Sequence, residues 1–91
     1  MKNPEFVNAQ EMARNHPHTF GVPSKEELDS IKKGSSVKVS AGNERFWVTV
    51  DEVNGDELTG FVDNDLICSD EHGLEYGSPI AFKKENIYAI Y

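Results

Sequence analysis

FWVTVDEVNGDELTGF, from Phe46 to Phe61, has the pattern of a β-hairpin. A run of apolar and threonine residues leads to Asn54-Gly55, and a second short run follows through Leu58 and Thr59. Asn-Gly between two such runs is the strongest short-range hairpin signal, because both central residues of the turn must tolerate a positive φ. We therefore predict two antiparallel strands joined by a tight turn at Asn54-Gly55.

The first strand of this hairpin, from Arg45 to Val53, contains one irregularity in its alternation. Phe46 and Val50 share one face of the strand, and Val53 falls out of phase with them. Either a β-bulge near Asp51-Glu52 restores Val53 to the core, or strong coiling buries parts of both faces, as in small barrels. Both alternatives imply a bent strand.

Further strands are predicted on both sides of the hairpin. Val37 and Val39 alternate with polar residues before it, Ile80 and Phe82 alternate after it, and 87–91 forms a last strand. Five short strands with one tight hairpin favour a curled antiparallel sheet that closes into a small SH3-like β-barrel. The expected fold class is α+β, with two short helices preceding the barrel.

The two helices are indicated by their capping residues. Asn8 can cap a helix through Arg14, and Ser24-Lys25-Glu26-Glu27 is a capping box. The second helix is expected to include Lys32-Lys33 in its last turn, where cations suit the helix dipole, and to stop at Gly34. We therefore expect one domain, 1–91, with a helix and linker over 1–19 and a barrel over 20–91.

Length and composition point to a small protein that folds on its own. The 91 residues are 37% hydrophobic and include five Phe, three Tyr and one Trp, enough for one packed core. The single cysteine, Cys68, cannot form an internal disulfide, and no signal peptide or membrane span is recognisable. A cytoplasmic protein is expected, as a monomer or a weak homodimer that pairs through an exposed edge of its sheet.

The acidic residues are concentrated in the second half of the chain. The net charge is −7, and no Lys or Arg lies between Phe46 and Phe82. The acids inside this window are Asp51, Glu52, Asp56, Glu57, Asp63, Asp65, Asp70, Glu71 and Glu75. Such a surface disfavours direct nucleic-acid binding, which needs clustered cations, whereas it attracts a basic protein surface. The alternative is that the acidic charge serves solubility alone.

The sequence resembles the YegJ-like domain, a bacterial family of unknown function. The resemblance spans roughly residues 20 to 91 and rests on the order of its turns and strands. Its matching features are Val22-Pro23-Ser24, Lys33-Gly34, Val37-Lys38-Val39, Glu44-Arg45-Phe46-Trp47-Val48, Val53-Asn54-Gly55-Asp56, Thr59-Gly60, Asp63-Asn64-Asp65, Gly73-Leu74-Glu75-Tyr76-Gly77, Ile80, Phe82 and Ile87. The resemblance implies a bacterial or phage origin, and because the family has no established activity, no catalytic residue carries over from it. The chain departs from the family pattern at Leu66, where a proline is expected.

These observations predict a non-enzymatic module without a cofactor, which binds a basic protein surface. An inhibitor, an immunity protein or an anti-defence protein would fit this description. The predicted binding residues are Asp51, Glu52, Asp56, Glu57, Asp63, Asp65, Asp70, Glu71 and Trp47. Trp47 becomes a binding anchor only if its ring is exposed, since a tryptophan in a small barrel otherwise belongs to the core.

Other chemistries compete with this prediction. A small-molecule or metal site near His16, His18 and His72 is the alternative function, because these imidazoles could converge once the linker folds back. Asp63-Asn64-Asp65 offers oxygen ligands for calcium but lacks the spacing of a calcium loop, so a turn or a solvated loop is the competing interpretation. Cys68 has acidic neighbours, which disfavour a nucleophilic thiolate. We predict that no metal is bound.

Overall fold

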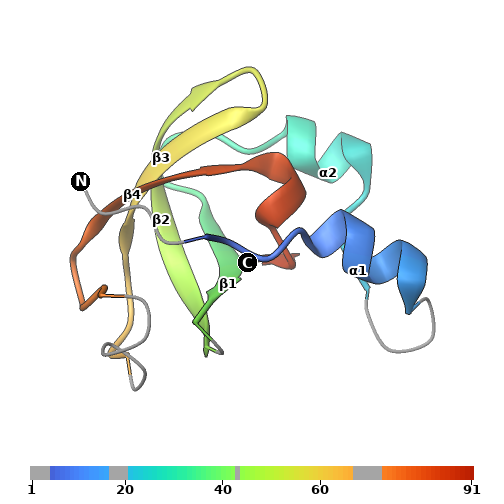
Figure 1. Cartoon of the computed structure of the whole chain (residues 1–91). Coiled ribbons are helices and arrows are strands. Elements are labelled where there is room, and N and C mark those ends of the chain that lie inside the picture. Colours follow the sequence, from blue (N-terminus) through green and yellow to red (C-terminus); the bar gives the residue numbers. More distant parts are fainter. Residues whose placement is uncertain (1–4, 17–20, 43, 67–72) are drawn as a thin grey trace.

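The computed structural model describes residues 5–16, 21–42, 44–66 and 73–91. Helices α1 (Ala9–Asn15) and α2 (Lys25–Asp29) precede a five-stranded antiparallel sheet in the order β4-β3-β2-β1-β5 (Figure 1). The strands are β1 (Ser36–Ala41), β2 (Glu44–Asn54), β3 (Glu57–Val62), β4 (Pro79–Lys83) and β5 (Ala89–Ile90). This confirms the α+β class, the five antiparallel strands and the two short helices. The sheet is open, with β4 and β5 as its edges.

The hairpin forms as predicted, but its turn lies one residue further along the chain. Asn54 pairs with Glu57 as part of the ladder, so Gly55 and Asp56 are the two turn residues. Gly55 has a φ of 64°, a conformation that glycine adopts at little cost. Asn54 therefore ends β2 and is not a central residue of the turn.

A β-bulge bends β2, which is one of the two predicted alternatives. The register with β3 shifts between Val50 and Glu52, which leaves Asp51 as the extra residue. After the bulge Val53 pairs with Leu58 and packs partly against the core. The bend lets β2 pair with β1 along its first half and with β3 along its second half.

The core lies on the concave face of the curled sheet. Val37, Phe46, Val48 and Ile80 are buried there together with the inward residues of the other strands. Phe6, which precedes α1, places its ring 6.4 Å from that of Phe46 and 6.2 Å from that of Phe82, measured between ring centroids. The N-terminal segment therefore contributes an aromatic side chain to the same core.

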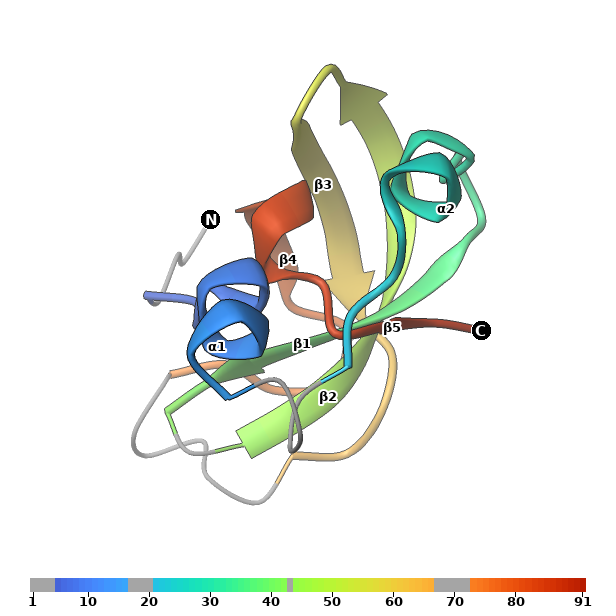
Figure 2. The same ribbon diagram turned by 90° about the vertical axis from the view of Figure 1, so that its right-hand side faces the viewer.

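The N-terminal segment is also tied to the sheet by hydrogen bonds. The backbone N–H of Val7 donates to the carbonyl of Ser40 at 2.9 Å, and the Val7 carbonyl accepts from the side chain of Asn86 at 3.1 Å. Asn86 belongs to the 3-10 turn η1 (Lys84–Asn86), against which α1 packs. Figure 2 shows α1 beside η1 on the same side of the sheet as α2. Residues 5–16 are thus packed on the sheet, a question that the sequence leaves open for the helix and linker predicted over 1–19.

The helix starts are confirmed, and the end of α2 is not. Asn8 accepts from the backbone N–H of Glu11 at 3.0 Å, and Ser24 and Glu27 form the capping box. However, α2 ends at Asp29, and Ser30 is its C-cap, whose hydroxyl donates to the Glu27 carbonyl at 2.7 Å. Lys32-Lys33 therefore lies outside the helix, in a turn closed by the Ser35 N–H on the Lys32 carbonyl at 2.9 Å.

The last strand is shorter than predicted. The sequence predicts it over 87–91, but β5 comprises Ala89–Ile90, which pairs with Val37 and Lys38 of β1. Ile87 is buried as the chain leaves η1. The backbone N–H of Tyr91 continues the pairing by donating to the Ser36 carbonyl at 2.9 Å, which fixes the position of Tyr91 beside β1.

Candidate functional site

The convex face of the sheet carries a group of aromatic and polar side chains. Side chains alternate between the two faces of a strand, so the neighbours of the buried core residues point outward. Lys38 of β1 lies opposite Trp47 of β2, and Thr49 of β2 lies opposite both Ser36 and Phe61. We call this surface the outer face and define it by Ser36, Lys38, Trp47, Thr49, Phe61, Asp63 and Tyr91.

Trp47 is half-buried on the outer face and does not belong to the core. Its ring meets that of Tyr91 edge to face, with centroids 6.3 Å apart and an interplanar angle of 87°. The ammonium of Lys38 lies 5.4 Å from the Trp47 ring centroid. Part of the Trp47 side chain is therefore accessible to a partner, which is the condition that the sequence sets for Trp47 to act as a binding anchor.

Asp63 lies next to Trp47 at the end of β3. Its backbone N–H donates to the Trp47 carbonyl at 2.9 Å, and its carboxylate oxygen Oδ2 accepts from the Thr49 hydroxyl at 2.9 Å. A hollow of about 280 Å³ is lined by Ser36, Trp47, Asp63 and Tyr91. One carboxylate and two aromatic rings thus border the same space.

Asn64 fixes the chain that leaves β3, a role that sequence reasoning missed. Its side-chain oxygen accepts from the backbone N–H of Trp47 at 2.6 Å, and its side-chain nitrogen donates to the Asp65 carbonyl at 2.8 Å. The Asn64 oxygen is therefore engaged by the backbone of β2, and the chain bends at Asn64 as it leaves β3.

The exposed aromatic residues reinforce the outer face. Phe61 is 46% exposed and Tyr91 is 98% exposed, and both belong to this surface. Large apolar side chains that stay accessible in one region of a small protein mark interaction surfaces. Tyr76, which is 62% exposed, is the other large hydrophobic residue left accessible in the described part of the chain.

The predicted acidic binding residues lie in two separate places. Glu52, Asp56 and Glu57 are exposed around the hairpin turn, whereas Asp63 and Asp65 are exposed beyond the opposite end of β3. The length of β3 separates the two groups by roughly 20 Å. Asp51, in the bulge, is half-buried, and Asp70 and Glu71 lie outside the described residues.

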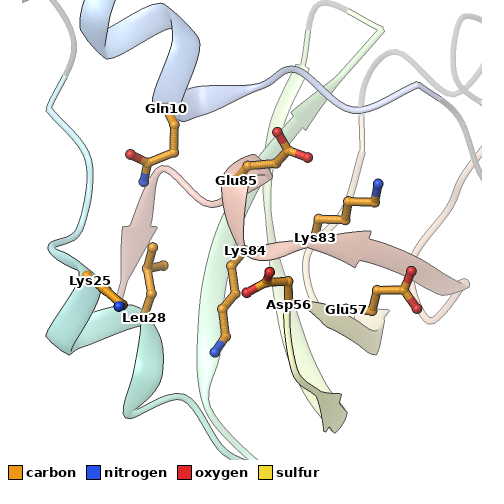
Figure 3. A pocket seen from close by; sticks show the side chains of 8 residues that line it. All are labelled: Gln10, Lys25, Leu28, Asp56, Glu57, Lys83, Lys84 and Glu85. Atoms are coloured by element: carbon orange, nitrogen blue, oxygen red, sulfur yellow. The ribbon is translucent and has the colours of Figure 1, made fainter.

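The hairpin acids stand close to basic residues. A hollow of about 650 Å³ lies between the hairpin turn, α1, α2 and η1, and Figure 3 shows the side chains that line it. Its charged residues are three lysines, Lys25, Lys83 and Lys84, and three carboxylates, Asp56, Glu57 and Glu85. Glu57 pairs with Lys83 in the sheet register, and the Lys84 ammonium lies 3.3 Å from Asp29. The six charged residues that line this hollow balance one another, and Asp29, which contacts Lys84, adds one more carboxylate.

The alternative metal site is not assembled from the residues that can be described. His16 is exposed at the end of α1, while His18, Cys68 and His72 lie outside the described residues. Over the described ranges, no three His, Cys, Asp or Glu side chains form a group that could hold a metal ion. Within those same ranges, no helix is both long enough and apolar enough to cross a bilayer.

The chain matches no family model, no curated protein and no solved structure. The YegJ-like resemblance therefore stays a prediction from the sequence, and the geometry of the site has to carry any proposed function.

Proposed function

We propose that this protein is a non-enzymatic binding module that holds a basic protein surface against its outer face. The observation that carries the proposal is the position of Asp63 beside Trp47 and Tyr91. Aromatic residues are enriched at the centres of protein interfaces, where they supply most of the binding energy. A neighbouring carboxylate selects a partner of positive charge and accelerates its approach.

Exposed carboxylates next to aromatic rings, and not charge alone, support the outer face over the hairpin turn as the site, since Lys38 lies on the outer face as well. Asp63 and Asp65 are exposed next to the aromatic residues, and the net charge of −7 attracts cations to the molecule as a whole. At the hairpin turn, Lys83 and Lys84 stand beside the carboxylates of Asp56 and Glu57. Of the acidic residues that the sequence predicts to bind, we therefore propose that Asp63 and Asp65 belong to the binding site and that Asp56 and Glu57 do not.

The proposed architecture is an SH3-like barrel that is completed by the N-terminal segment. In support, β2 bends at a bulge, so that its first half pairs with β1 and its second half with β3. Such bent strands occur where a sheet curls towards closure. The Val7–Ser40 hydrogen bond places the N-terminal segment beside β1 on the side where β5 no longer pairs. Such a scaffold holds the outer face rigid, which suits an inhibitor, an immunity protein or an anti-defence protein of a bacterium or phage. We propose a monomer, or a weak homodimer, that acts in the cytoplasm.

The proposal is tested with two variants that remove the same charge from opposite ends of β3. The first variant is Asp63→Asn with Asp65→Asn, and the matched control is Asp56→Asn with Glu57→Gln. The probe is a lysine- and arginine-rich peptide, whose binding is followed at several salt concentrations. We expect the first variant to weaken binding about tenfold at low salt and to flatten its salt dependence, and the control to change both much less, since it lowers only the general negative charge.

Equal losses in the two variants would show that the peptide responds only to net charge, which would contradict the proposed site. Binding that neither variant changes would contradict the proposed function.

A further inference from the structure

We propose that the hollow between Ser36, Trp47, Asp63 and Tyr91 takes one arginine side chain of the partner. This inference rests on the proposed function and adds the identity of the group that is recognised. It goes beyond charge attraction, because it assigns a single residue type to a single place on the outer face.

The walls of the hollow have the chemistry that a guanidinium group requires. The Trp47 and Tyr91 rings stand at 87° to one another, so a planar cation that lies against one ring presents an edge to the other. Guanidinium stacks on aromatic rings and is more weakly hydrated than ammonium, so less solvation is lost when it enters such a site. The two rings therefore favour arginine over lysine.

The polar side of the hollow completes the match. Thr49 occupies one position on the Asp63 Oδ2 atom, and an ionised carboxylate offers further acceptor positions on both of its oxygens. A guanidinium can donate two parallel hydrogen bonds to a carboxylate, which an ammonium cannot. The Ser36 hydroxyl, which also lines the hollow, is a further acceptor.

Asp63 is held in place before any ligand arrives. The Thr49 hydroxyl holds its carboxylate, and the Asp63 N–H bonds to the Trp47 carbonyl. The next residue, Asn64, accepts from the Trp47 N–H. A group that is already ordered loses less conformational freedom when it binds, so the geometry favours recognition of one defined side chain.

The protein's own cations show that this fold accommodates positive groups on aromatic rings. The guanidinium carbon of Arg45 lies 4.6 Å from the Tyr88 ring centroid, and the Lys38 ammonium lies 5.4 Å from the Trp47 ring centroid. Lys38 stands beside the hollow with the same charge as the proposed ligand. Removing the Lys38 charge should therefore strengthen the binding of a cationic peptide, whereas removing the Asp63 charge should weaken it.

The test uses three short peptides that are built mainly of serine and glycine. At the same repeated positions, the first peptide has arginine, the second has lysine, and the third has citrulline, the neutral isostere of arginine. Because the chain contains one tryptophan, the fluorescence of Trp47 reports on the hollow directly. With the unaltered protein we expect the arginine peptide to bind about fivefold more tightly than the lysine peptide, given the stacking and bidentate contacts. The citrulline peptide should show no binding that depends on salt.

Variants locate the effect within the hollow. Asp63→Asn should reduce the preference for arginine over lysine to near unity, and Asp56→Asn, at the other end of β3, should leave it unchanged. Tyr91→Ala should weaken arginine binding several-fold, with Tyr91→Phe close to the unaltered protein. Lys38→Gln should strengthen the binding of both cationic peptides. Thermal unfolding of each variant verifies that it is folded.

The outcomes separate the inference from the proposed function. If arginine and lysine peptides bind equally, and both depend on Asp63, the arginine site is overturned while the basic-partner function stands. If the binding of neither cationic peptide depends on Asp63, both the arginine site and the proposed basic-partner function are overturned. Because the peptide comparison uses the unaltered protein, it distinguishes arginine from lysine even if a variant fails to fold.

Discussion

The ring of Phe6 packs against that of Phe46 with their centroids 6.4 Å apart, although 39 positions separate them in the chain. Phe46 belongs to the bent strand β2, and Phe6 belongs to the segment that precedes α1. This contact joins the N-terminal segment to the core of the sheet. The N-terminal segment therefore stabilises the scaffold on which the outer face is built.

Phe6→Ala should lower the free energy of unfolding by about 2 kcal/mol, less than for a fully buried phenylalanine because Phe6 is only partly buried. The loss follows from the removal of contacts with both Phe46 and Phe82. Urea denaturation measures it, and Phe6→Leu, which retains most of the apolar volume, is the control. An unchanged midpoint in Phe6→Ala would show that the N-terminal segment does not stabilise the sheet.

Gly60→Ala should destabilise the protein by about 3 kcal/mol or prevent its folding, because the site has no room for a methyl group. A Cβ at Gly60 would lie 2.5 Å from the Thr49 carbonyl oxygen and 2.7 Å from Val48 Cγ1. The control is Gly21→Ala, where a Cβ would meet no atom within 4 Å. Thermal unfolding compares them, and similar melting temperatures for the two variants would refute this packing.

Asn86→Asp should cost about 2 kcal/mol, because it exchanges a donor for an acceptor at a buried position. Asn86 accepts from the Lys83 N–H at 2.8 Å and donates to the Val7 carbonyl at 3.1 Å. Aspartate retains the first bond and places a carboxylate against the Val7 carbonyl. Asn54→Asp, at the exposed end of β2, adds the same charge without this contact and is the control in urea denaturation. A loss of equal size in the control would mean that added charge, and not the broken bond, is responsible.

Thr49→Val should weaken the binding of an arginine-rich peptide about threefold and leave the fold intact, since only one hydrogen bond to Asp63 is removed. Thr59→Val is the control, since Thr59 lies on the adjacent strand β3 and does not line the hollow. Fluorescence titration of Trp47 gives both affinities. If the two variants bind with the same affinity, Thr49 does not position the carboxylate.

Local signals in the sequence predict the elements of the fold well. The hairpin and both helix caps depend on neighbouring residues, which the sequence displays directly. The bulge in β2 is one of two alternatives, because a break in alternation shows that a strand bends but not how. The predicted end of α2 is wrong: the helix ends at Asp29, where Ser30 is the C-cap and its hydroxyl donates to the Glu27 carbonyl, and does not continue to Gly34.

The candidate site is predicted less completely, because it depends on contacts across strands. In the sequence, the acidic residues from Asp51 to Glu75 form one continuous group. In the structure, Glu57 lies at one end of β3 and Asp63 lies just beyond its other end. The contact between Trp47 and Tyr91 requires that β5 pair with β1, which no local pattern specifies. Trp47 and Asp63 are predicted individually, whereas their meeting in one hollow follows from the sheet order.

An NMR titration of the labelled protein with an arginine-rich peptide locates the bound surface residue by residue, without any substitution in the chain. We predict that the largest amide shifts occur at Ser36, Trp47, Asp63 and Tyr91, and that the hairpin turn at Gly55-Asp56 shifts little. Shifts that instead concentrate at the hairpin turn and around Lys83-Lys84 would contradict the assignment of the outer face as the binding site.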